Sequence, residues 1–292
     1  MVDWMQVMAK HFYAIPGEHG LIAGATGTGK TQGLYYLLHG IQKYSPDETL
    51  VWFDCGKSAE ILRLAEFGEV TIHLHLYHRI EIKTKNKILL ERIRFKEFTK
   101  AEELWSGLDR GRINVISIEP FFQDPGEYAR ILADIFMSLI ALARKYQLPV
   151  PMAIFIDEAH LIAPSPGIVL NSVHDRAAVW FQRNVEMLRS LGVRIIATTQ
   201  GWEKIRKGVR SSFGWVFVKR GCNFLSDRPR LAKFNSQWML LHDDEWIIVP
   251  PDSNFSNPIV VEFYGDGKSL GKVFYHEDEE MMPSVIPAPA QA

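Results

Sequence analysis

The segment GATGTGKT, residues 24–31, constrains the fold more than any other part of the sequence. An apolar run, 21–23, precedes it and a helical pattern, 32–42, follows it. Glycines at this spacing let the backbone curl so that successive N–H groups point at one anion, and the helix dipole adds to the attraction. We therefore predict a phosphate-binding loop between a strand and a helix. The predicted nucleotide-binding residues are Gly24, Ala25, Thr26, Gly27, Thr28, Gly29, Lys30, Thr31 and Gln32.

Two side chains of this loop have expected chemical roles. Lys30 would reach the β- and γ-phosphates of a nucleoside triphosphate, and the Thr31 hydroxyl would be offered to Mg²⁺. The alternative is a glycine-rich turn that binds nothing. The strand before the loop and the helix after it favour nucleotide binding.

A second candidate segment is MAIFIDEAHLIAP, residues 152–164, an apolar strand that ends in two carboxylates. We expect this strand to lie beside the first one. Asp157 would then hold the Mg²⁺ shell, and Glu158 would polarise a water for in-line attack. The alternative for both residues is a helix-capping pair at the end of a strand.

The composition narrows the class of protein. With 292 residues, 47% of them hydrophobic, the chain can form one large domain with a buried core. A net charge of −1 excludes a wholesale nucleic-acid binder, so such contacts would need local basic patches. Cys55 and Cys222 are too few for a disulfide framework or a zinc site. The apolar stretch 131–143 is shorter than the roughly 20 residues of a membrane span, and no signal-peptide pattern is present, so we expect a cytoplasmic protein.

Strand-like and helix-like segments alternate along the chain. Helical patterns cover 128–146 and 173–191, and this alternation indicates an α/β fold with a mainly parallel sheet covered by helices on both faces. The last two apolar runs are joined by a turn-rich link and predict an antiparallel edge or hairpin. The expected strands are 20–24, 50–54, 70–76, 113–118, 153–157, 194–199, 215–218, 246–249 and 259–263.

Two segments depart from this alternation. Residues 79–112 carry many interleaved charges and are interpreted as an insertion, with a short hairpin around KTKNK. Residues 277–292 are acidic and then rich in proline and alanine, so we expect a tail that is disordered or depends on a partner. The remainder, 1–276, is expected to form one domain.

The segment RSLGVRIIATTQ, residues 189–200, distinguishes among classes of P-loop protein. A strand that ends in Gln200 would place an amide near the γ-phosphate, where it could sense hydrolysis. Arg189 lies at the end of the preceding helix, which Gly192 closes. A DEAH-type helicase would need a second motor domain, and an ABC-type ATPase would need a Ser-Gly-Gly signature before the Asp-Glu strand, which this sequence lacks.

HGLIAGATGTGKT, FIDEAH and RSLGVRIIATTQ, in this order, resemble the HerA–FtsK superfamily of ring-forming DNA-pumping ATPases over about residues 19–220. The resemblance implies a RecA-like P-loop NTPase, with ATP and Mg²⁺ as cofactors, that acts on double-stranded DNA as a homo-oligomeric ring, by expectation a hexamer. It also implies that Arg189 enters the neighbouring subunit's site and that Gln200 is the sensor. Arg183, Arg194 or Arg210 could serve instead of Arg189, which could also be a helix-end arginine favoured by the dipole.

Within this superfamily the chain is most similar to the genome-packaging ATPases of tailless membrane-containing viruses. Other members of the superfamily carry an additional barrel, membrane anchor or DNA-reading domain, and we expect none of these in this chain. Capsid or portal-vertex proteins would then be partners, and the location would be the host cytoplasm or the virion. The alternatives are a soluble HerA-like or conjugation-type DNA translocase and, from another class, a nucleotide-dependent virion or filament assembly protein.

The stretch 203–220 directly follows the expected sensor strand and is rich in basic residues. We expect it to grip the DNA backbone, and the loop 163–176 is the other candidate for lining a pore. The alternative is a solvated basic face on a nearly neutral protein. The candidate DNA-binding residues are Lys204, Arg206, Lys207 and Arg210.

Overall fold

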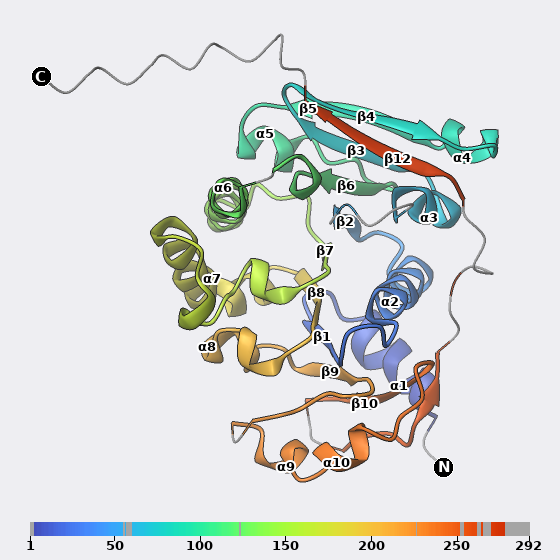
Figure 1. Cartoon of the computed structure of the whole chain (residues 1–292), viewed down its shortest axis with the longest axis vertical. Helices are drawn as coiled ribbons and strands as arrows, with labels where there is room; N and C mark the ends of the chain where they lie inside the picture. The colour runs from blue at the N-terminus through green and yellow to red at the C-terminus, as the bar shows by residue number, and fades with distance from the viewer. Residues whose placement is uncertain are drawn as a thin grey trace, which may run out of the picture.

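The computed structural model describes residues 3–277, except 55, 57–59, 123, 226, 252–253, 262–263 and 265–269. A central sheet of ten strands, in the order β11-β10-β9-β1-β8-β7-β2-β6-β3-β5, runs through the molecule (Figure 1). Its neighbours pair in parallel from β9 to β5, and β10 is antiparallel to both β9 and β11. The predicted mainly parallel sheet with an antiparallel edge is therefore confirmed.

Most strands have the bounds expected from the sequence. They are β1 (Gly20–Ala23), β2 (Thr49–Asp54), β3 (Val70–His75), β4 (His78–Lys83), β5 (Ile93–Phe98), β6 (Ile113–Ser117), β7 (Met152–Ile156), β8 (Val193–Thr199), β9 (Trp215–Val218), β10 (Glu245–Val249), β11 (Ile259–Val260) and β12 (Lys272–Glu277).

Helices cover both faces of the sheet (Figure 1). One face carries α1 (Trp4–Met8), α2 (Lys30–Tyr44) and α3 (Glu60–Phe67), and the other carries α5 (Ala101–Ser106), α6 (Pro125–Arg144), α7 (Ser172–Ser190) and α8 (Lys207–Arg210). The remaining helices are short: α4 (Lys87–Glu91), α9 (Pro229–Ala232) and α10 (Asn235–Trp238).

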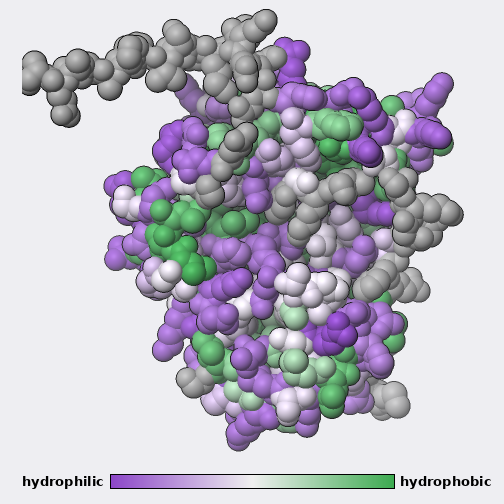
Figure 2. Space-filling view, in the orientation of Figure 1, coloured by the Kyte–Doolittle hydropathy of each residue, from purple (hydrophilic) through white to green (hydrophobic). Residues whose placement is uncertain are grey.

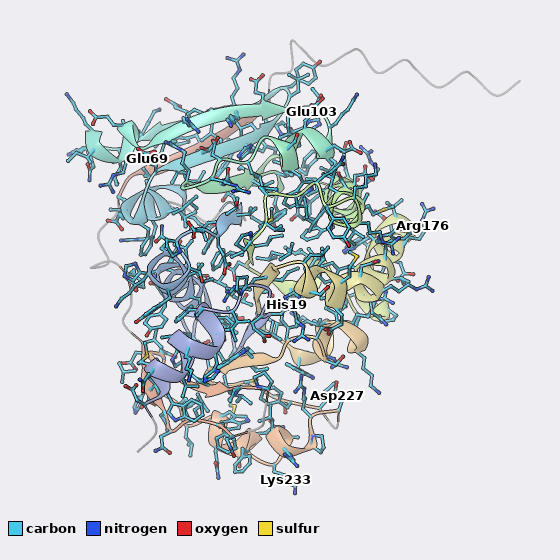
Figure 3. All side chains as sticks on the ribbon, turned by 180° about the vertical axis from the view of Figure 1, so that it is seen from behind. His19, Glu69, Glu103, Arg176, Asp227 and Lys233 are labelled. Carbon is cyan, nitrogen blue, oxygen red and sulfur yellow. The ribbon has the colours of Figure 1, made fainter. Side chains whose placement is uncertain are left out.

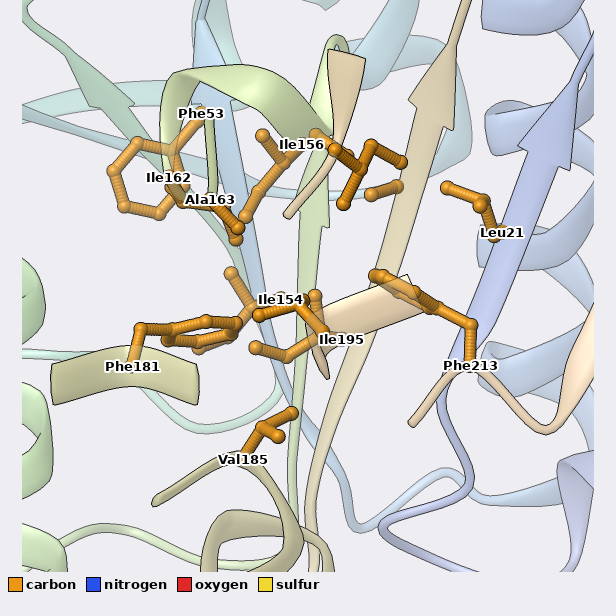
Figure 4. Close-up of a cluster of buried hydrophobic side chains, with 14 of the residues drawn as sticks. Leu21, Phe53, Ile154, Ile156, Ile162, Ala163, Phe181, Val185, Ile195 and Phe213 are labelled. Atoms are coloured by element: carbon orange, nitrogen blue, oxygen red, sulfur yellow. The ribbon is translucent and has the colours of Figure 1, made fainter. Parts of the chain in front are cut away.

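The central strands are buried on both sides, and this explains their near-continuous apolar sequences. In β7, Ile154 and Ile156 pack into the cluster beneath α6 and α7, whereas Phe155 packs into the cluster beneath α2. Figure 4 shows the first cluster, in which Phe181 and Val185 of α7 lie over Ile154 and Ile195. Alternate side chains therefore fix the helices of both faces to one sheet.

The order of the central strands corrects one expectation. The strand that ends before Asp157, β7, does not lie beside β1, because β8 lies between them and pairs with both. Strand order is set by long-range pairing, which the sequence of a single strand does not encode. As a result, the strand that carries Gln200 at its end separates the phosphate loop from the two carboxylates.

The charged segment 79–112 contains a second correction. The predicted hairpin around KTKNK is wrong, because β4 pairs with the distant β12 in a separate two-stranded sheet. β5 instead joins the main sheet, parallel to β3, as its edge strand. Exposed Arg94 and Glu97 on β5 hid the strand pattern, and charged side chains of this kind protect a free sheet edge from association. Of the predicted tail 277–292, residues 278–292 lie outside the described part.

A buried ion pair holds the N-terminal segment against the start of β8. Arg194 and Glu48 are fully buried, with 2.6 Å between Arg194 Nη2 and Glu48 Oε1. The same guanidinium donates to the carbonyl oxygens of Phe12, Tyr13 and Ile15. Arg194 is therefore committed to its own subunit, which removes it from the candidates for an arginine that enters a neighbour.

His19, just before β1, is buried between α7 and β8 (Figure 3). Its Nδ1 accepts from the Ile195 N–H at 3.1 Å, and its Nε2 lies 3.1 Å from the Val185 carbonyl oxygen. The first contact leaves the proton on Nε2, so the ring is neutral. Burial lowers the pKa of His19 to about 4.

This pKa predicts a specific loss of stability in acid. Between pH 6.5 and 4 the unfolded chain binds a proton at His19 that the folded chain does not, so stability is full above pH 6.5 and falls by ~3 kcal/mol towards pH 4. We expect His19→Gln to flatten the pH dependence of urea unfolding free energies over this window. The matched control, His11→Gln at an exposed histidine, should keep the pH dependence of the unmodified protein. Equal pH dependence for the unmodified protein and both variants would exclude this role of His19.

Candidate nucleotide-binding site

The loop 24–29 adopts the curled conformation expected of a phosphate cradle. Gly27 and Gly29 have φ of +78° and +74°, which favour glycine, and Gly29 is followed directly by the first turn of α2. A Cβ at Gly24 would lie 2.8 Å from the Lys219 side chain, so a larger residue would displace the loop. The Gly24 N–H donates to the Thr199 carbonyl and the Ala25 N–H to that of Arg220, which fixes the loop between the ends of β8 and β9.

The side chains of Lys30 and Thr28 are folded onto the loop. Lys30 Nζ donates to the Ala25 carbonyl oxygen at 2.8 Å, and the Thr28 hydroxyl donates to the same oxygen at 2.8 Å. The Lys30 ammonium therefore lies over the cradle, where a phosphate would bind. Gln32, also predicted to bind nucleotide, uses its side-chain oxygen to accept the Tyr264 N–H.

Asp157 lies against the start of α2 and is buried, with 2% exposure. Its two carboxylate oxygens accept from the Thr31 hydroxyl at 2.8 Å and from the Thr198 hydroxyl at 2.6 Å. Thr31 and Asp157 thus present adjacent oxygen ligands, the type that Mg²⁺ prefers. No cluster of three or more His, Cys, Asp or Glu that could hold a metal occurs in the described part of the chain, but Mg²⁺ at a nucleotide uses one or two protein oxygens plus phosphates and water.

Glu158 is held in place by its backbone and by both carboxylate oxygens. Its φ of +89° is unusual for a residue with a side chain, and its N–H donates to the Thr198 hydroxyl. Oε1 accepts from Gln200 Nε2 at 2.6 Å, and His160 Nδ1 lies 3.3 Å from Oε2. Burial raises the pKa of Glu158, but the hydrogen bonds from His160 and Gln200 outweigh it, and the net shift is downward. Glu158 is therefore ionised at neutral pH.

Gln200 connects the phosphate loop to Glu158. Its Oε1 accepts from the Thr26 hydroxyl at 2.9 Å, while its amide nitrogen donates to Glu158. Residues predicted from three separate motifs are thus in contact at the carboxyl ends of β1, β7 and β8. Thr198 and His160 were not recognised in the sequence. Thr198 could have been found, because residues two apart on a strand face the same side and Thr198 precedes Gln200 by two.

Arg189 lies near the amino end of β8, whereas the phosphate loop of its own subunit lies at the carboxyl ends of the strands. It is in the last turn of α7, before β8 begins, and the seven residues of β8 span about 23 Å to Gln200. Its side chain is 48% exposed, and its guanidinium lies 3.4 Å from a Glu18 carboxylate oxygen and 3.3 Å from a Glu186 carboxylate oxygen. The alternative Arg183 is also exposed, whereas Arg210 is buried.

The predicted DNA-binding residues do not form one basic surface. Arg210 is paired with Asp227, with 3.1 Å between the charged groups, and donates to the Trp202 carbonyl. Arg206 is paired with Asp175 and only 13% exposed. Lys207 is exposed and Lys204 partly exposed. Of the four, only the two lysines keep their charge at the surface.

The sheet and the loop geometry are those of the RecA-like P-loop fold. The genome packaging NTPase B204 of Sulfolobus turreted icosahedral virus 2, in complex with ATP-gammaS, is similar with a TM-score of 0.51 and 13% sequence identity, over 84% of this chain and 99% of that one. The bacterial conjugative coupling protein TrwBdeltaN70 is similar with a TM-score of 0.52 and 12% identity, over 86% of each chain. At such identities the likeness concerns the fold, and it confirms the fold implied by the HerA–FtsK resemblance.

No protein-family model matches this sequence, and no curated protein matches it. Within the described residues, no helix combines the length and the apolar character that a membrane crossing requires.

Proposed function

We propose that this chain is an ATPase that moves double-stranded DNA as part of a homo-oligomeric ring. The observation that carries the proposal is the contact of Gln200 with both Thr26 and Glu158, which joins the phosphate loop to an ionised carboxylate. A glycine-rich turn without function would not need this arrangement. The resemblance of the fold to a genome packaging NTPase and to a conjugative coupling protein supports the same class.

Each site residue has a role in this mechanism. Lys30 leaves the Ala25 carbonyl and binds the β- and γ-phosphates, and the N–H groups of residues 27–31 surround them. Thr31 and Asp157 would hold Mg²⁺, which supplies neutralising charge to the phosphates. Glu158 orients a water in line with the γ-phosphate and accepts its proton. Because the pKa of Glu158 is lowered, its carboxylate is deprotonated at neutral pH and can accept this proton.

Gln200 is proposed as the sensor, because its side-chain oxygen and its side-chain nitrogen each make a hydrogen bond within the site. A phosphate oxygen beside Thr26 would compete with the Gln200 carbonyl oxygen for the Thr26 hydroxyl, and the freed Gln200 side chain could then move away from Glu158. The nucleotide state would then be reported to residues that follow β8.

The loops after β7 and β8 are joined, which supports a common movement. Pro164 and Ile205 form an isolated antiparallel bridge, the Ser165 N–H donates to the Lys204 carbonyl, and the Arg206 N–H donates to the Ala163 carbonyl. Hydrophobic surface gathers over α7 (Figure 2). In the loop before this helix, Ile168 and Leu170 are 38% and 49% exposed. We propose that the two joined loops face the DNA.

Lys204 and Lys207 are proposed to bind phosphates of the duplex without reading its sequence. Each such contact releases counterions, so the slope of log affinity against log salt should become less steep by about 0.9 per lysine lost. We expect Lys204→Ala with Lys207→Ala to flatten the slope by about 2 units and to leave basal ATP hydrolysis unchanged. Binding of two unrelated duplexes over a range of salt concentrations measures this slope.

The matched control carries two substitutions at exposed lysines of another surface, Lys85→Ala and Lys87→Ala. Its slope should equal that of the unmodified protein. If the Lys204 and Lys207 variant also keeps that slope, the DNA-binding surface lies elsewhere.

Genome packaging into a viral capsid is our preferred biological role, with capsid or portal-vertex proteins as partners and the host cytoplasm or virion as location. The similarity to TrwBdeltaN70 favours one alternative, a conjugation-type or HerA-like translocase. ATP turnover with and without duplex DNA, measured beside the mass of the assembly, tests the shared function. A protein that hydrolyses ATP without any response to DNA would instead support a nucleotide-dependent assembly protein.

A further inference from the structure

A groove of about 600 Å³ opens between the end of β5 and helices α5, α6 and α7. Its size is within the range of roughly 300–1,000 Å³ typical of ligand pockets. None of its lining residues belongs to the nucleotide site, and nothing in the mechanism above uses it. The groove is therefore a candidate binding site for something other than the nucleotide.

The described part of the chain ends beside this groove. β12 pairs with β4 so that Glu277 lies opposite His78, and the His78 ring is 5.6 Å from that of His75, which lines the groove. β12 ends on the same side of the molecule as α5 (Figure 1). The sequence continues as DEEMM, residues 278–282, and five extended residues reach up to about 17 Å. The segment is long enough to enter the groove.

One end of the groove is basic and the other end is apolar. Residues 278–282 change in the corresponding order, from acidic to apolar. Exposed Arg130 and Lys100 lie at the end near His75, whose pKa is lowered by burial and by the Arg130 charge. Further along α6 the wall becomes apolar, with Met137 and Trp180 each 38% exposed. The segment itself begins with three carboxylates and continues with two methionines.

A buried hydroxyl in the groove also lacks a partner. Ser138 is 7% exposed and lines the groove, yet its Oγ makes no hydrogen bond. An unsatisfied buried hydroxyl is costly, and an acceptor from an occupant would satisfy it. Glu102 and Asp134 also line the groove, so the occupant must place its own carboxylates towards the basic end and not along the middle.

We propose that residues 278–282 of this chain bind in the groove of their own subunit, with the carboxylates at Arg130 and Lys100 and the methionines against Met137 and Trp180. The charged end is attracted to the two cations, and the methionine side chains cover exposed apolar surface. Sulfur also packs favourably at the edge of an aromatic ring. This inference goes beyond the ATPase function and does not depend on it.

Disulfide trapping in the full chain tests the proposal. In a Cys55→Ser background, Met137→Cys combined with Met282→Cys should form a disulfide within one chain at least about tenfold faster than the control pair Ile88→Cys with Met282→Cys, because binding raises the local concentration. Ile88 is an exposed residue of α4, outside the groove. Equal rates for the two pairs, or disulfides only between chains, would overturn the proposal.

Charge reversal provides a second measurement in the same background. Arg130→Glu should slow the Met137–Met282 cysteine pair by about twofold to fivefold, the effect of one exposed ion pair, and Glu279→Arg in the same chain should restore the rate. The exposed lysine variant Lys85→Glu should leave the rate unchanged. If Arg130→Glu has no effect beyond that of Lys85→Glu, the carboxylates do not bind at the basic end of the groove.

Discussion

Replacement of Arg189 by alanine is expected to leave ATP binding intact and to slow hydrolysis by about 10³-fold or more. The reason is geometric: Arg189 lies near the amino end of β8, about one strand length from its own phosphate loop, and in the proposed ring it would reach the γ-phosphate of a neighbouring subunit. Nucleotide affinity and turnover of Arg189→Ala measure this effect. Arg183→Ala, at another exposed arginine of α7, is the matched control and should remain active.

Mixing of two inactive variants tests whether Arg189 acts between subunits. Lys30→Ala removes the phosphate-binding ammonium, so this variant alone should not bind ATP. A ring that contains both Lys30→Ala and Arg189→Ala subunits still has composite sites with one intact Lys30 and one intact Arg189. Partial recovery of hydrolysis is therefore expected, whereas a co-assembled mixture without recovery would contradict an arginine acting in trans.

Replacement of Glu158 by glutamine is expected to preserve ATP binding and to reduce hydrolysis by about 10²- to 10⁴-fold, the usual contribution of a general base. The amide keeps the size of the side chain but loses the charge that His160 and Gln200 stabilise. Binding and single-turnover hydrolysis should be measured together. Glu203→Gln, at an exposed carboxylate near the end of β8, should behave as the unmodified protein, and a Glu158→Gln enzyme with normal turnover would remove Glu158 from this role.

The parts of the fold that were predictable from sequence are those whose local pattern is unambiguous. β7 is apolar on both faces and is followed directly by Asp157, and the glycine spacing of residues 24–29 requires a curled loop before a helix. Side chains at the carboxyl ends of neighbouring parallel strands meet at one edge of the sheet. The motifs around Lys30, Asp157 and Gln200 could therefore be assigned to one site before their contacts were known.

Other features depend on pairing between distant segments, which no single motif encodes. The position of β8 between β1 and β7, and the pairing of β4 with β12, are fixed by long-range contacts. The burial of Arg210 follows from its ion pair with Asp227, so a basic stretch in the sequence did not become a basic surface. The hydrogen bond from Thr198 to Asp157 likewise depends on the pairing of β7 with β8.

Displacement of a third DNA strand from a duplex measures movement along DNA most directly. A long duplex carries the triplex-forming strand at one end, and the protein is added with ATP. We predict that the unmodified protein displaces the strand in an ATP-dependent manner and that Glu158→Gln, although it binds ATP and DNA, does not. No ATP-dependent displacement by a protein that hydrolyses ATP and assembles on the same duplex would contradict the assignment as a DNA translocase.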